Sequence, residues 1–414
     1  MPDEKGPDWT ESLMVTDKGT FVGNHHNAIL MLRHDLRIRG SIGINVRGQM
    51  PWCLRDSPAG PAGPWADAHT SSLTAWLQRE NFPVGPEIVD RAIGVVGREN
   101  PVNPVGDWLR IQASEWDGKK RTDTWVIEYL GAADTKLNRA LGPMILIGAA
   151  ARGIDPGVQC DTVPVLEGPQ GSLKSSAIRV LGGPFGCENL PDFHSKDAAM
   201  VVGLYFIVEI AELTALLKSP VAELNAFITR RKDTFRPPYG RYVVEQPRGA
   251  FLIGSCNPQT IGYLRDPTGG RRFLPVAVGV IDLAKLRDDV GQLWGEAATR
   301  YLSGDAVWWP GTEILAELGD AQSKRYEGDI WEYRILETVE DLADPFTIEK
   351  VVAQAFPESH QHRIDKSMQV RIGSILSTRQ PPLKCVRRYV GGTRVRLYSK
   401  SDIPDEAPKT EGQA

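Results

Sequence analysis

The sequence lacks the features by which membrane, secreted and zinc-binding proteins are usually recognised. No apolar run approaches the roughly 20 residues that a membrane-spanning helix needs. The first residues are acidic and lack the basic-then-apolar pattern of a secretory signal. The five cysteines are scattered and form no Cys-x-x-Cys pair, which argues against a structural zinc site and fits a reducing compartment. The sequence therefore predicts a cytoplasmic protein with no membrane association.

An excess of charge of one sign is also missing. The 48 Lys and Arg residues nearly balance the 52 Asp and Glu residues, and the formal net charge is −4. Any affinity for nucleic acid must therefore come from local basic clusters. With 414 residues, of which 41% are hydrophobic, the chain has the composition of a globular protein of about two or three domains.

The segment Gly168–Ser175 has the spacing of a phosphate-binding loop, G-x-x-x-x-G-K-[ST], with one exception. The apolar run Val163–Leu166 precedes it and a helical pattern follows, which is the strand–loop–helix context that such a loop requires. Backbone N–H groups bind phosphate oxygens, the lysine reaches the β/γ-phosphates and the next hydroxyl binds Mg²⁺. The exception is Leu173, which stands where the pattern has its last glycine. Taken alone, the segment could also be a Gly-rich turn with an incidental lysine.

The candidate nucleotide-binding residues are Gly168, Pro169, Gln170, Gly171, Ser172, Leu173, Lys174, Ser175 and Ser176.

Two later predicted strands end on polar residues. The run Leu204–Val208 is predicted to be a strand ending on Glu209, with Glu212 just beyond, where carboxylates could orient Mg²⁺ and its water as in a Walker B element. The run 250–256 ends on Asn257, an amide that in AAA+-type ATPases positions water against the γ-phosphate (sensor 1). Acids at a solvated helix start and an ordinary turn asparagine are the alternatives.

Two arginines, Arg271 and Arg272, lie in a glycine turn before a last strand at 273–276. An arginine supplied by a neighbouring subunit can stabilise charge on a phosphoryl group during transfer. A surface salt bridge or a contact to DNA phosphate is the alternative use of these side chains.

A basic segment, 229–248, lies between the two polar strand ends. It has six basic residues against two acidic ones, a charge of +4, and Pro237–Gly240 predicts a turn between short extended runs. Such a hairpin suits a single strand, because cations bind the backbone and aromatic rings stack on the bases. A structural hairpin with solvated arginines is the alternative. The predicted DNA-binding residues are Arg230, Arg231, Lys232, Arg236, Tyr239 and Arg241.

The alternation of apolar runs and helical patterns after residue 160 predicts an α/β fold with a mainly parallel sheet. Near the N-terminus, the Pro- and Gly-rich segment Ser57–Trp65 is predicted to be an exposed loop. At the C-terminus, helices at 347–355 and 365–377 and a hairpin at 385–398 have winged-helix order. Between residues 363 and 396, nine basic residues against one acid favour phosphate binding. The predicted organisation is an N-terminal mixed α/β region (1–103), a helical connector (104–159), a P-loop ATPase core (160–302), a helical linker (303–329), a basic winged-helix-like domain (330–400) and a disordered tail (401–414).

Taken in order, these motifs resemble the virulence-associated protein E family, P-loop ATPases of phages and mobile elements that are related to superfamily 3 helicases. The resemblance covers roughly residues 22–398. Besides the loop, it rests on Trp116-Asp117-Gly118, Gly131-Ala132 with Asp134-Thr135, Glu209–Leu213, Phe235–Arg241 and Thr268–Pro275.

The resemblance implies an AAA+-like core that binds ATP and Mg²⁺. It implies a homo-oligomeric ring, a hexamer, acting as an ATP-dependent DNA helicase or translocase on single-stranded DNA, with any primase on a separate chain. The competing hypothesis is a non-catalytic DNA-binding replication initiator or loader that uses ATP as a switch. The implied roles are phosphate and metal binding for Lys174 and Ser175, Walker B acid for Glu209, sensor for Asn257, arginine finger for Arg271 or Arg272, and DNA contact for the 229–248 hairpin.

Overall fold

The structure, a computed structural model, describes residues 9–188, 190–193, 195–211, 221–236, 242–257, 264, 272–305, 311–325, 331–357, 366–379, 381–390 and 393–401. The chain divides into two compact units, residues 1–259 with 271–322 and residues 260–270 with 323–414. In these described ranges, no helix is long and apolar enough to cross a bilayer.

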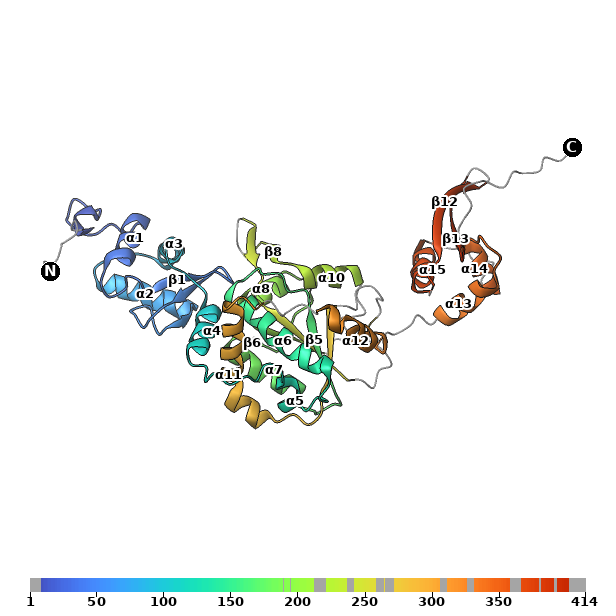
Figure 1. Cartoon of the computed structure of the whole chain (residues 1–414). Helices are drawn as coiled ribbons and strands as arrows, with labels where there is room; N and C mark the ends of the chain where they lie inside the picture. The colour runs from blue at the N-terminus through green and yellow to red at the C-terminus, as the bar shows by residue number, and fades with distance from the viewer. Residues whose placement is uncertain are drawn as a thin grey trace. The chain divides into compact units, whose positions relative to one another are not determined.

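The first unit is built around a sheet with helices beside it (Figure 1). The sheet has five strands in the order β11-β5-β10-β7-β6, and every neighbouring pair is parallel. All residues of β5, β7 and β10 are buried, as in strands covered on both faces. The predicted α/β fold with a mainly parallel sheet is confirmed. The strands are β5 (Val163–Glu167), β6 (Gly186–Cys187), β7 (Ile207–Ile210), β10 (Phe251–Cys256) and β11 (Phe273–Ala277).

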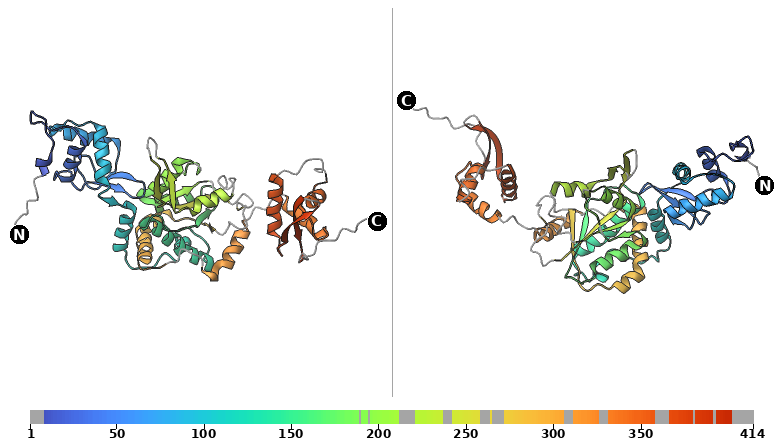
Figure 2. Two further views of the ribbon diagram at one scale, coloured as in Figure 1. Left: turned by 90° about the horizontal axis from the view of Figure 1, so that it is seen from above. Right: turned by 180° about the vertical axis from the view of Figure 1, so that it is seen from behind.

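Helices that precede and follow the sheet strands in the sequence share one hydrophobic core with the sheet (Figure 2). Helix α11 packs against α4, α6 and α7, so the helical segment before the phosphate loop forms part of the layer under the sheet. The helices of this core are α4 (Pro104–Ser114), α5 (Trp125–Glu128), α6 (Lys136–Ile154), α7 (Lys174–Gly182), α11 (Leu283–Leu302) and α12 (Thr312–Ser323). Two further helices, α8 (Lys196–Leu204) and α10 (Val221–Thr229), contribute none of their described residues to it. A separate antiparallel hairpin consists of β8 (Lys232–Phe235) and β9 (Val244–Pro247).

One predicted strand boundary is wrong. Leu204 ends helix α8, and strand β7 begins only at Ile207, so Glu209 lies inside the strand and not at its end. The apolar run 204–208 therefore spans a helix end and a strand start, which apolar periodicity alone does not distinguish.

The N-terminal part of the first unit has a small sheet in the order β3-β2-β1-β4, with α1 and α3 packed together beside it. The prediction that Ser57–Trp65 is an exposed loop is wrong in part. Residues 63–64 pair with β2, and Ala59 is buried in the cluster formed by the helices. The elements are η1 (Trp9–Ser12), α1 (His25–His34), β1 (Ile42–Asn45), β2 (Met50–Cys53), β3 (Gly63–Pro64), α2 (Asp67–Arg79), α3 (Pro86–Gly97) and β4 (Pro101–Val102).

A buried arginine, Arg47, ties this N-terminal part to the layer of helices. Its Nη2 donates to the carbonyl of Tyr205 at 2.6 Å, and Nη1 lies 3.4 Å from the carbonyl of Arg152 near the end of α6. Carbonyls at a helix C-terminus favour a cation. A Cβ on Gly249 would lie 2.4 Å from the guanidinium carbon, so a larger residue there would displace the Arg47 side chain.

The second unit contains the helices and the hairpin predicted for the C-terminal region, with one further helix, α13, before them. Phe346 and Tyr398 exchange backbone hydrogen bonds of 2.9 and 2.8 Å, which joins the segment before α14 to β13. The elements are α13 (Glu332–Asp341), α14 (Ile348–Ala355), α15 (Lys366–Thr378), β12 (Lys384–Val390) and β13 (Thr393–Ser399).

Candidate nucleotide-binding site

The loop 168–173 joins β5 to α7, so the predicted strand–loop–helix context is present. The Gly168 N–H donates to the carbonyl of Cys256 at 3.3 Å, which ties the start of the loop to the end of β10. Gly171 and Leu173 have φ values of 81° and 62°. Pro169, Gln170 and Gly171 are exposed at the edge of the sheet. The loop is therefore open to solvent and placed at the N-terminus of a helix, where anions are favoured.

The Lys174 side chain folds back over this loop. Its Nζ donates to the carbonyls of Gly168 at 2.8 Å and Pro169 at 2.9 Å, and to Ser172 Oγ at 3.1 Å. Partial burial lowers the pKa of the Lys174 ammonium from its usual value. Phosphate oxygens entering the loop would compete with these three acceptors for the same donor hydrogens.

Glu209 connects the loop helix to two strands of the sheet. Its side chain is buried, and its Oε1 accepts hydrogen bonds from Ser175 Oγ and Ser255 Oγ, both at 2.7 Å. In the register of β10 and β7, Ile253 pairs with Glu209, and Ser255 lies on the same face as Ile253 because side chains alternate. The structure thus brings together a hydroxyl and a carboxylate, oxygen ligands that suit Mg²⁺.

Asn257 lies at the same edge of the sheet as the loop. It follows the last residue of β10, Cys256, which pairs with Glu167 at the end of β5. Sequence reasoning did not single out Ser255, the second hydroxyl on Glu209. A polar residue at an inward position of an otherwise apolar strand is the signal that could have found it.

Arg272 lies at the opposite edge. Phe273 pairs with Val163, the first residue of β5, whereas the loop follows the last residue, Glu167. At about 3.3 Å per residue the two edges are roughly 13 Å apart, so the structure does not bring Arg272 to the loop of its own chain. Arg272 Nε is buried and makes no hydrogen bond within the described residues. Four predicted site residues lie outside the described part of the chain: Glu212, Tyr239, Arg241 and Arg271.

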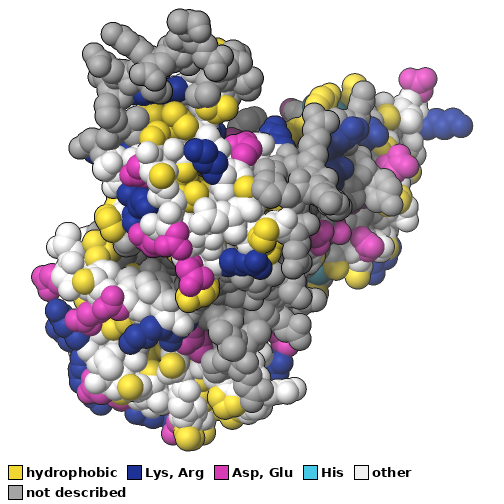
Figure 3. Space-filling view, turned by 90° about the vertical axis from the view of Figure 1, so that its right-hand side faces the viewer, with side chains coloured by type: hydrophobic (Ala, Val, Ile, Leu, Met, Phe, Trp, Pro, Cys, Tyr) yellow, Lys and Arg dark blue, Asp and Glu magenta, His cyan; other side chains and the backbone are white. Residues whose placement is uncertain are grey.

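The β8–β9 hairpin carries less available positive charge than its composition indicates. Arg248 is buried, and its Nη2 lies 2.5 Å from Asp233 Oδ1, so this pair is structural. Lys232 pairs with Glu245 at 2.8 Å, and Arg231 donates to the carbonyl of Gly157. The cations described among the predicted DNA-binding residues are all exposed: Arg230, Arg231, Lys232 and Arg236. On the face shown in Figure 3, basic and acidic side chains are interspersed and not gathered by sign.

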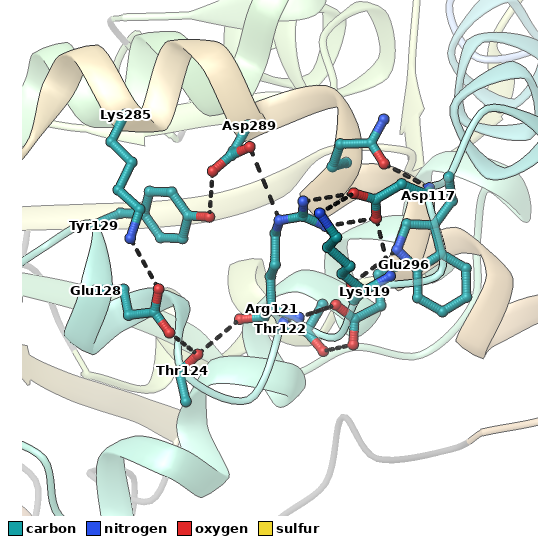
Figure 4. Close-up of polar contacts among 12 residues, drawn as sticks. Asp117, Lys119, Arg121, Thr122, Thr124, Glu128, Tyr129, Lys285, Asp289 and Glu296 are labelled. Atoms are coloured by element: carbon teal, nitrogen blue, oxygen red, sulfur yellow. Dashed lines mark hydrogen bonds and ion pairs between the residues drawn. The ribbon is translucent and has the colours of Figure 1, made fainter.

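A buried carboxylate that the sequence analysis missed, Glu296 on α11, holds the loop that follows α4 (Figure 4). It accepts from the backbone N–H groups of Arg121 at 2.5 Å and Thr122 at 2.9 Å, and from Thr122 Oγ1 at 2.6 Å. Beside it, two 2.8 Å hydrogen bonds from Arg121 hold the pKa of the Asp117 carboxyl well below its usual range. This gives the Trp116-Asp117-Gly118 motif a structural role. The sequence feature that could have identified Glu296 is a single acidic residue surrounded by apolar residues in a predicted helix.

Leu173 has φ 62° and ψ 19°, the left-handed region, and its side chain is 47% exposed. A non-glycine residue there is strained by about 1–2 kcal/mol, and the exposed side chain contributes little packing. We expect Leu173→Gly to raise the free energy of unfolding by about 1 kcal/mol, measured by chemical denaturation. Leu173→Ala is the control, because it keeps the Cβ and the strain and should leave stability nearly unchanged. A less stable glycine variant would contradict the expectation.

The family that the motifs resemble is also the family whose model matches this chain. A family model described as the virulence-associated protein E-like domain matches residues 111–327, which include the loop, Glu209 and Asn257. Two solved apo structures of the NrS-1 C-terminal region are similar in part. One is 9% identical, covers 86% of this chain and 96% of that chain, and has a TM-score of 0.42. The other, residues 305–718, is 10% identical, covers 86% and 95%, and has a TM-score of 0.39. No curated protein matches the chain.

Proposed function

Because the chain belongs to the virulence-associated protein E-like domain family, we propose that it is a Mg²⁺-dependent ATPase that acts as a DNA helicase or translocase in the replication of a phage or mobile element. The observation that carries the proposal is the buried Glu209 carboxylate, 2.7 Å from the hydroxyl of Ser175, which directly follows the loop lysine. This pairing joins two motifs that are 34 residues apart in the sequence. A Gly-rich turn with an incidental lysine would not need it.

The residues at the loop fit a nucleoside triphosphate and Mg²⁺. Backbone N–H groups of the loop after Pro169 and of the first turn of α7 would bind phosphate oxygens, and the Lys174 ammonium would exchange its present acceptors for the β- and γ-phosphates. Ser175 and Glu209 would hold the metal, which when bound neutralises charge on the phosphates. Ser255 would keep the Glu209 carboxylate oriented through its 2.7 Å hydrogen bond.

The strand order supports an AAA+-like core. Strand β10 lies between β5, which leads into the loop, and β7, which carries Glu209. Asn257 at the end of β10 therefore stands between the two, where a sensor amide could position the attacking water.

A ring assembly, a hexamer by the family resemblance, follows as part of the proposal. Arg272 lies at the sheet edge away from its own loop, so an arginine finger at this position would act on the nucleotide of a neighbouring subunit. Arg271, outside the described residues, is the alternative finger. The nucleotide would then bind between subunits.

Single-stranded DNA is the proposed substrate of translocation, and the exposed cations of the β8–β9 hairpin are its proposed contacts. The second unit would add contacts to the phosphate backbone. Arg387 and Arg396 stand directly opposite each other on β12 and β13, and both are exposed. Like charges at such positions repel, and an anionic partner would relieve this cost. Any primase would be a separate chain.

The second candidate function is a DNA-binding initiator or loader that uses ATP as a switch without turning it over. The strained Leu173 next to the lysine favours this alternative, because the loop departs there from the glycine pattern.

The test is DNA-stimulated ATP hydrolysis by the full chain and by Lys174→Ala. We expect single-stranded DNA to stimulate hydrolysis several-fold in the wild type and hydrolysis to fall at least about 100-fold in the variant, since its ammonium is lost. If both proteins hydrolyse ATP equally slowly while the wild type still binds ATP and DNA, the switch is the correct function. Lys136→Ala, an exposed lysine on α6, is the matched control.

A further inference from the structure

We propose that the nucleobase of the bound nucleotide packs on the exposed side chain of Val280, in the loop 278–282 between β11 and α11. The inference rests on the proposed nucleotide binding at Gly168–Ser175. In the sheet, Ala277 at the end of β11 pairs with Glu167 at the end of β5. The loop 278–282 and the phosphate loop therefore leave the same edge of the sheet from neighbouring strands.

The two loops are in close contact. The Val278 N–H donates to the carbonyl of Glu167 at 2.8 Å. A Cβ on Gly168 would lie only 2.8 Å from Val278 Cγ2, so the first glycine of the phosphate loop packs against this valine. Val280 is two residues further along the loop.

The direction of the nucleotide follows from the position of Glu209. Metal and terminal phosphates belong beside Ser175 and Glu209, and Glu209 lies on β7, on one side of β5. Strand β11 lies on the other side of β5. A nucleotide with its terminal phosphates toward Glu209 would extend its nucleoside end over the loop that follows β11.

The loop that carries Val280 is held rigidly. The N–H groups of Gly279 and Asp282 donate to the carbonyls of Leu130 and Tyr129, both at 3.0 Å. Gly131, with φ 66°, packs so closely that a Cβ there would lie 2.6 Å from the Val280 carbonyl oxygen. The segment 128–131, which binds the Val280 loop, is in turn attached to α11 by side-chain contacts seen in Figure 4. They are the hydrogen bond from Tyr129 Oη to Asp289 at 2.8 Å, the ion pair of Lys285 with Glu128 at 2.9 Å and the cation–π contact of the Lys285 ammonium with the Tyr129 ring.

Val280 is nevertheless 91% exposed, more than any other large hydrophobic side chain in the described residues. A single exposed valine on a mobile loop would need no explanation. On a loop whose backbone is bound on both sides, it presents a fixed apolar surface that a flat heterocycle can cover without an ordering cost. An aliphatic side chain has no hydrogen-bonding group, so the contact would not distinguish adenine from guanine.

The experiment compares ATP with inorganic triphosphate, which has the phosphates and no base, by calorimetry on the full chain with Mg²⁺. We expect Val280→Asn to weaken ATP binding about five- to tenfold through lost apolar contact, and GTP binding equally, with triphosphate binding unchanged. Val280→Trp should strengthen ATP binding several-fold by stacking, again without effect on triphosphate. Val95→Asn, at an exposed valine on α3, is the control.

The outcomes separate this inference from the proposed function. If the wild type binds neither ATP nor triphosphate, the proposed nucleotide site is wrong. Suppose that Lys174→Ala weakens the binding of both ATP and triphosphate, while both Val280 variants keep the wild-type ratio of the two affinities. The proposed nucleotide site is then correct, and the base binds somewhere other than Val280. Equal weakening of both ligands by Val280→Asn would also overturn the inference, because the valine would then act on the phosphate loop.

Discussion

Replacing Glu209 with glutamine is expected to reduce the rate of ATP hydrolysis by at least about 100-fold while ATP binding changes less than about threefold. Glutamine keeps the shape of the side chain and an acceptor oxygen for Ser175 and Ser255, so the packing around β7 is preserved. It lacks the negative charge that, in the proposed site, would hold the metal and orient the attacking water. Steady-state hydrolysis and equilibrium binding of ATP measure the two quantities separately.

The control for this prediction is Glu99→Gln. Glu99 is an exposed carboxylate that pairs with Arg33 in the N-terminal part of the unit. Its neutralisation should leave hydrolysis within about twofold of the wild type. If Glu209→Gln hydrolysed ATP at the wild-type rate, the buried carboxylate would be only a structural partner of the two serines. The ATPase mechanism proposed above would then be wrong.

Replacing Glu296 with alanine is expected to lower the free energy of unfolding by about 4 kcal/mol. The buried carboxylate accepts three hydrogen bonds, and its removal leaves the N–H groups of Arg121 and Thr122 without their acceptor. It also leaves Arg300, whose Nη1 lies 3.8 Å from the carboxylate, with one less counter-charge. Chemical denaturation of the two proteins gives the difference directly.

A matched variant separates this network from a general effect of removing an acid from a helix. Glu313→Ala, at an exposed position of α12, should change stability by no more than about 0.5 kcal/mol. If Glu296→Ala is as stable as Glu313→Ala, the loop that carries the Trp116-Asp117-Gly118 motif is held by other contacts. The motif would then need a different explanation.

Local patterns predicted the strand–loop–helix structure around residues 168–173 correctly. Val163–Glu167 is a strand, the loop follows it and Lys174 begins a helix, because such elements depend on residues close in sequence. Leu173 could be predicted only in part. Its departure from the glycine pattern is visible in the sequence, but the positive φ that makes a glycine desirable there is seen only in the folded loop.

Long-range contacts could not be predicted in the same way. The carboxylate of Glu209 was expected at the end of a strand, and it proves to be buried within one, where it accepts from Ser175 and Ser255. Arg248 was counted as part of a basic surface, and it is buried against Asp233. Composition gives a charge count, whereas burial decides which charges face solvent.

By itself, the sequence determined the family, the parallel α/β sheet and the place of the strand–loop–helix segment at 163–182, because each follows from short motifs and from the spacing of apolar residues. Tertiary structure alone decided which side chains meet. Strand order placed Glu209 and Asn257 beside the loop and Arg272 at the opposite edge, since parallel strands bring all their carboxyl ends to one edge of the sheet. The same order set the loop of Val280 against the phosphate loop, two segments that are more than a hundred residues apart in the chain.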